Sequence, residues 1–107
     1  MVKLCNYKTK GIAVYVEAHI KDRGLEISGQ DLGSNVEDFG GTDEYEYYYS
    51  LTPIETEKLY HLLKADSKLD IDLLELIKLY FSDVEGCKNF RKYCEKHNIP
   101  FGFFNYC

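Results

Sequence analysis

The residues of this chain with the greatest chemical potential are carboxylates gathered in one central segment. Residues 37–57 contain neither Lys nor Arg, although the whole 107-residue chain has a formal net charge of only −5. The acidic residues of this segment are Glu37, Asp38, Asp43, Glu44, Glu46, Glu55 and Glu57. Because the negative charge is local, a basic surface on a partner protein is its natural complement. A solvated acidic loop that only promotes solubility is the alternative interpretation.

These carboxylates do not follow a known catalytic or metal-binding pattern. A Ca²⁺ loop requires acidic residues at alternate positions, a glycine and a distal Glu, and this spacing is absent from the sequence. Acid/base catalysis by a pair of carboxylates requires an apolar pocket that separates their pKa values, and no motif indicates such a pocket. We therefore predict no metal site, no cofactor and no catalytic carboxylate.

Cys94 and His97 are the second candidates for chemistry, because they lie three residues apart among basic residues. A thiolate nucleophile with a histidine base is one interpretation of this pair. A cysteine on the buried face of a helix is much more often a small apolar core residue, and we predict that role for Cys94. His19 and His61 have no obvious companions in the sequence, and we predict surface or packing roles for both.

The cysteines give no sign of a disulfide framework or a zinc site. They lack C-x-x-C spacing, and they are Cys5, Cys87, Cys94 and Cys107. No secretory signal or apolar run of ~18 residues is present, so we expect reduced thiols, a cytoplasmic location and no membrane span. The negative net charge also argues against nucleic acid as a partner.

Alternating apolar residues predict a meander of strands in the first third of the chain, over residues 2–8, 12–20 and 25–29. In the second of these strands, the residues predicted to face the core are Val14, Val16, Ala18 and Ile20. Gly24 is predicted to supply a positive φ in the turn before the third strand. Regular structure is then predicted to stop over Gln30–Gly41, a stretch rich in glycine and polar residues.

A tyrosine-rich strand is predicted over residues 45–52. Its alternation directs Tyr45, Tyr47 and Tyr49 toward the core, and Glu46 and Tyr48 toward the opposite face.

Three helices are predicted next, over residues 53–65, 70–82 and 86–97. Thr52, Pro53 and Glu55 form a capping-box sequence at the start of the first helix, and Asp70 is the predicted cap of the second. A closing strand is predicted over Phe101–Tyr106, beside one of the earlier strands.

This order of elements predicts one α+β domain over residues 1–107. Its architecture is an antiparallel sheet of four to five strands with three helices packed on one face. A mixed sheet remains open, because the closing strand arrives from a long helical excursion and parallel pairing is an alternative.

Three hypotheses for function follow from these elements. The first is a non-enzymatic acidic module that binds a basic protein through Glu37, Asp38, Asp43, Glu44, Glu46 and Tyr48. The second is a small enzyme or ligand-binding protein with a pocket under the Gln30–Gly41 loop, where Asp31, Tyr45 and Tyr47 are the first candidates to line it. The third is a homodimer formed through the aromatic closing strand.

Several stretches also carry a resemblance to other sequences. They are GQDLG at 29–33, DEYEYYYSL at 43–51, KLYHLL at 58–63 and NIPFGFF at 98–104. Together they resemble a group of small uncharacterised bacterial proteins that are similar to immunity proteins of bacterial toxin systems. The resemblance implies a bacterial domain that neutralises a partner protein. It transfers no functional residue, because the shared stretches contain no catalytic motif.

Overall fold

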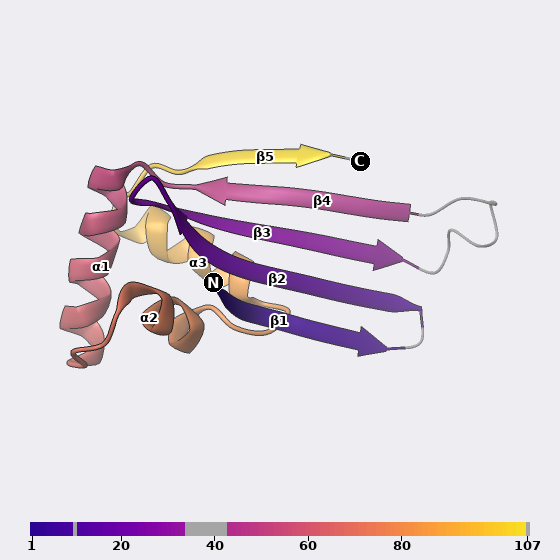
Figure 1. The fold of residues 1–107 in the computed structure, drawn as a ribbon, viewed down its shortest axis with the longest axis horizontal. Coiled ribbons are helices and arrows are strands. Elements are labelled where there is room, and N and C mark those ends of the chain that lie inside the picture. Colours follow the sequence, from indigo (N-terminus) through magenta and orange to yellow (C-terminus); the bar gives the residue numbers. More distant parts are fainter. Residues whose placement is uncertain (10, 34–42, 107) are drawn as a thin grey trace.

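The computed structural model describes residues 1–9, 11–33 and 43–106 of the chain. They form a five-stranded antiparallel sheet and three helices, as predicted from the sequence (Figure 1). In chain order the elements are β1 (Val2–Thr9), β2 (Ile12–Lys21), β3 (Gly24–Gly33), β4 (Asp43–Ser50), α1 (Pro53–Ser67), α2 (Leu73–Tyr80), α3 (Gly86–Lys96) and β5 (Gly102–Tyr106). The helices gather at one end of the sheet, and the strands extend beyond them (Figure 1).

The strands lie in chain order across the sheet, from β1 to β5. The closing strand pairs with β4, and the pairing is antiparallel, so the mixed-sheet alternative is wrong. The end of α3 explains why the chain enters β5 antiparallel to β4. Asn98 adopts a φ of 56°, and the N–H of Ile99 donates to the Cys94 carbonyl at 2.8 Å. This closure reverses the chain and brings it back alongside β4.

The alternation predicted for the strands is confirmed with one exception. Tyr47 and Tyr49 are buried on the helix-covered face of the sheet, and Val16 is buried there too. Ile20 lies outside the core and is 42% exposed. The reason is the extent of β1, whose pairing with β2 ends at Val2 opposite Ala18 and leaves Ile20 beyond it.

The turn between β2 and β3 differs from the prediction. The positive φ angles belong to Asp22 (51°) and Arg23 (67°), not to Gly24. Lys21 and Gly24 close a two-residue turn, and a turn of type I′ has positive φ at both central positions. Glycine is required at position 24 for another reason, because a Cβ there would lie 2.5 Å from the Leu51 carbonyl oxygen.

Strand β3 continues to Gly33, so the prediction that regular structure stops at Gln30 is wrong. Gln30 pairs with Glu46 and Asp31 pairs with Tyr45 in the β3–β4 ladder. The tyrosine-rich β4 supplies the neighbouring backbone, and this pairing overrides the weak strand preference of the glycine-containing stretch. The rest of the predicted loop, residues 34–41, lies outside the described residues.

Helix α1 begins as predicted, with a complete capping box between Thr52 and Glu55. Helix α2 is shorter than predicted, and its cap is Asp72, not Asp70. The Asp72 carboxylate accepts a hydrogen bond from the Glu75 N–H at 2.9 Å. Both aspartates were suitable by type, but only Asp72 directly precedes the helix.

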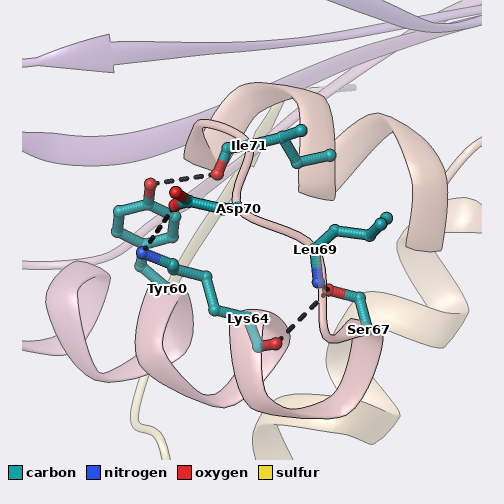
Figure 2. A network of polar contacts seen from close by, with 6 residues as sticks. All are labelled: Tyr60, Lys64, Ser67, Leu69, Asp70 and Ile71. Atoms are coloured by element: carbon teal, nitrogen blue, oxygen red, sulfur yellow. Dashed lines mark hydrogen bonds and ion pairs between the residues drawn. The ribbon is translucent and has the colours of Figure 1, made fainter.

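Asp70 instead helps to hold the connection between α1 and α2 (Figure 2). It forms an ion pair with Lys64 at 3.3 Å. The Tyr60 hydroxyl donates to the Ile71 carbonyl at 3.0 Å, and the Leu69 N–H donates to the Ser67 hydroxyl at 3.1 Å. These contacts fasten the connection to the last turns of α1.

The core lies between the helices and one face of the sheet. Its completely buried side chains include Ile27 from the sheet and, from the three helices, Leu59, Leu63, Leu76, Ile77 and Phe90. The N–H of Leu25 donates to the buried Thr56 hydroxyl at 2.9 Å, so α1 is also joined to β3 by a polar contact. Within the described residues, no helix has the length and apolar character needed to span a membrane.

Candidate functional site

The face of the sheet opposite the helices, called here the outer face, carries part of the predicted partner-binding set. Glu44, Glu46 and Tyr48 alternate along β4 and therefore share this face. Gln30 of β3 lies beside them in the ladder, opposite Glu46. We call these four residues the acidic cluster.

Side-chain contacts join the acidic cluster. The Gln30 amide donates to a Glu44 carboxylate oxygen, and the Tyr48 hydroxyl approaches Glu46 Oε2 at 3.5 Å. The hydrogen bond with Glu44 is the main cause of a raised pKa of Glu46, and the negative charge of Glu44 adds to it. The two negative charges repel each other, and a cation placed between them would relieve this repulsion.

The other predicted partner-binding residues are only partly placed. The backbone of Asp43 pairs with Gly33 at the start of β4, and its side chain lies outside the described part of the structure. Glu37 and Asp38 lie outside the described residues. The structure therefore brings together Glu44, Glu46 and Tyr48 of the predicted set.

The outer face is hollowed next to the acidic cluster. A hollow of about 370 Å³ is lined by Lys3, Cys5, Asn6, Tyr15, Val16, Glu17, Ser28 and Gln30. Gln30 belongs to both the hollow and the cluster, so the two form one continuous surface. Lys3 and Glu17 are neighbours in the β1–β2 register, so the hollow contains both charge signs.

An aromatic residue extends this surface on the other side. Phe104 of β5 lies opposite Tyr48 in the ladder, and 56% of its surface is exposed. Sequence reasoning assigned neither Gln30 nor Phe104 to the partner-binding set. The period-two alternation, extended through Gln30 and compared across strands, was the signal that could have identified them.

The residues proposed for the alternative pocket also come together. Asp31, Tyr45 and Tyr47 line one groove of about 320 Å³ between the helix-covered face of the sheet and α3, called here the inner groove. The remaining lining residues are Tyr49, Val84, Glu85, Cys87, Lys88, Arg91 and Phe103. The groove is walled by α3, a contribution that the sequence did not predict.

The polar groups of the inner groove are largely paired with one another. The Tyr47 hydroxyl donates to Asp31 Oδ1 at 3.1 Å, and Arg91 Nη1 donates to the Tyr49 hydroxyl at 2.8 Å. Burial raises the pKa of Tyr47 well above its ordinary value, so its hydroxyl stays protonated. Gly29 makes room for this ring, because a Cβ there would lie 2.2 Å from the Tyr47 ring carbons.

The cysteines within the described ranges have the character of structural thiols. Cys5, Cys87 and Cys94 are free, and Cys94 is completely buried. Burial raises the pKa of Cys87 to about 11 and that of Cys94 to about 12. Both thiols therefore stay protonated at neutral pH, which is unsuited to a nucleophile. The His97 ring lies 4.5 Å from the Tyr93 ring and packs against it.

Two histidines have partners that the sequence analysis did not identify. His19 Nε2 lies 3.1 Å from Glu26 Oε1, and these residues face each other across β2 and β3. His61 Nε2 lies 3.6 Å from Glu57 Oε1, one turn earlier on α1. His61 is exposed on α1, in agreement with a surface role. Over the described ranges 1–9, 11–33 and 43–106, no group of three or more His, Cys, Asp or Glu residues is arranged to hold a metal ion.

Comparison with known proteins adds no assignment to this geometry. No protein-family model matches the chain, and neither the curated proteins nor the solved structures contain a match.

Proposed function

We propose that this protein is a non-enzymatic binding module that recognises a basic surface on a partner protein, in the manner of an immunity-type inhibitor. The observation that carries the proposal is the joined pair of carboxylates on the outer face. Glu44 and Glu46 share one face of β4, beside the large amphipathic ring of Tyr48, whose hydroxyl approaches Glu46.

The chemistry of a basic partner fits this surface in two ways. A Lys or Arg side chain would relieve the repulsion between the carboxylates, because its positive charge would lie between the two negative ones. The exposed Phe104 offers aromatic contact area next to the charges, and aromatic residues with a charged rim are common at interface centres. The hollow beside Gln30 adds a concave surface for a protruding side chain.

A capture experiment with matched variants tests this proposal. The double variant Glu44→Gln/Glu46→Gln removes both charges while it preserves side-chain size. The control Glu75→Gln/Glu95→Gln removes two exposed charges from α2 and α3. We expect the first variant to weaken binding by about tenfold, because the interface loses two charges that would face a basic surface. Equal binding by both variants at low ionic strength would contradict the proposal.

A wider variant tests the full set predicted from the sequence. It replaces the acidic residues with Asn or Gln at Glu37, Asp38, Asp43, Glu44 and Glu46. We expect it to lose more affinity than the double variant and to show a weaker dependence on salt, because fewer charges are screened.

A second candidate function is the binding of a small ligand in the inner groove. It is favoured by one observation, the convergence of Asp31, Tyr45 and Tyr47 on a single concavity with an aromatic floor. Such a floor with polar groups at its edge is typical of small-molecule sites. Titration with a fragment library, followed by NMR shifts of Tyr45, Tyr47 and Arg91, tests it. A library that shifts none of these signals would exclude the groove as a ligand site.

A further inference from the structure

The two edges of the sheet differ in how they are protected. Strand β1 carries Lys3 and Lys8, and a β-bulge interrupts its register between Lys3 and Cys5. The N–H of Asp83 donates to the Leu4 carbonyl at 2.8 Å, so the segment after α2 occupies part of this edge. Lysines, bulges and covering segments are the usual means by which proteins prevent pairing between sheet edges.

Strand β5 at the opposite edge has none of these features. Its sequence, GFFNY, contains no charged residue and no proline. Within the part of the chain that the structure describes, its hydrogen-bonded neighbour is β4 alone. Phe103 is 48% exposed and Phe104 is 56% exposed, so aromatic surface flanks the edge on both faces of the sheet.

We propose that β5 pairs with β5 of a second copy of this chain and joins two five-stranded sheets into one. Pairing of β5 with β5 fits better than head-to-tail pairing of β5 with β1 of another copy, because the β1 edge is bulged and partly occupied. Pairing of like edges is self-complementary and closes after two subunits. The uncharged strip also allows contact between two chains that each carry a net charge of −5.

The register of this pairing follows from the strand itself. An antiparallel pairing that uses all of Gly102–Tyr106 places Phe104 opposite Phe104 of the second copy. Cross-strand aromatic pairs stabilise antiparallel ladders, and like charges at the same positions destabilise them. Phe104 is therefore the position at which a charge acts most strongly on the dimer.

Sedimentation of the isolated protein with charge variants at Phe104 tests the proposal. We expect wild type to approach twice the 12.5 kDa chain mass as concentration rises. Phe104→Lys and Phe104→Asp should each raise the dimer dissociation constant at least about tenfold, and an equimolar mixture of the two should recover association. The control Tyr7→Lys places the same charge on the half-exposed Tyr7 of β1 and should leave association unchanged.

Two results would overturn the proposal of a β5–β5 dimer. A wild-type protein that stays monomeric at the highest concentration overturns the proposal, as does a dimer that Tyr7→Lys weakens and Phe104→Lys does not. If circular dichroism shows that the Phe104 variants do not fold, the test uses wild-type protein instead. Isotope-labelled and unlabelled chains are mixed, and NOEs between the two kinds of chain are measured by NMR. We expect intermolecular NOEs between β5 protons, and their absence in a dimer refutes the β5 interface. No partner protein is present in these measurements, so their result is independent of the proposed function.

Discussion

The close approach of Gly86 to Phe81 gives the sharpest prediction for stability. Gly86 is buried at the start of α3, and a Cβ there would lie 1.9 Å from the Phe81 carbonyl oxygen. An ordinary C···O contact is about 3.3–3.6 Å, so Gly86→Ala requires a backbone shift of more than about 1 Å. Phe81 cannot yield easily, because its ring packs against Phe90 with the ring centroids 5.6 Å apart.

Two effects of Gly86→Ala oppose each other. Alanine favours helix by at most ~1 kcal/mol relative to glycine, and less at a first helical position. Overpacking of a rigid site costs ~1–3 kcal/mol and at times more. The clash involves backbone, which places the cost at the upper end, so we expect a net loss of ~2 kcal/mol and a fall in Tm of about 10 °C.

Urea denaturation followed by circular dichroism measures this effect, with Gly102→Ala as the control. A Cβ at Gly102 would lie 2.7 Å from the Ser50 hydroxyl oxygen, the end of a side chain that can rotate away. The control should therefore change the free energy of unfolding by less than ~0.5 kcal/mol. A Gly86→Ala variant as stable as wild type would refute the tight α2–α3 junction.

Three further predictions concern buried polar groups and ionisation. Thr56→Val removes the acceptor of the Leu25 N–H and should cost ~1–3 kcal/mol in urea denaturation, because a buried donor is left without a partner; no loss would contradict the α1–β3 contact. Burial raises the pKa of Cys87 to about 11 and that of Cys94 to about 12, both above the ordinary value of 9.0. The stability gained from burying the neutral thiols is therefore complete below pH 9 and is lost as pH rises toward 12. A urea midpoint that is flat across this range would count against burial of the thiols. Glu44→Gln should lower the pKa of Glu46 toward its ordinary value of 4.5, as measured by NMR titration, whereas an unchanged pKa would mean that the two carboxylates do not interact.

The sequence predicted the fold because local signals and packing agree over most of the chain. The alternating tyrosines of β4 and the capping box at Thr52 each identify an element without tertiary information. The errors arise where pairing between distant segments decides. Gln30 and Asp31 carry weak strand preference, and β4 makes them strand. Asp70 and Asp72 were equivalent by type, and the position at which the helix packs selected Asp72.

The candidate site was predictable in part for the same reason. Alternation placed Glu46 and Tyr48 on one face, and one strand suffices for that inference. The contact of Gln30 with Glu44 depends on the register between two strands, which the sequence of either strand does not specify. The inner groove likewise depends on how α3 packs over β3 and β4, so its wall of Cys87, Lys88 and Arg91 was not predicted.

The central claim is that the outer-face carboxylates bind a basic protein. Quantitative mass spectrometry of proteins captured from a lysate of the cells that encode this chain, at low and high ionic strength, tests it most directly. We expect wild type and Glu75→Gln/Glu95→Gln to retain the same basic protein at low ionic strength, and Glu44→Gln/Glu46→Gln to lose it. Equal capture of the same proteins by all three forms would contradict the claim.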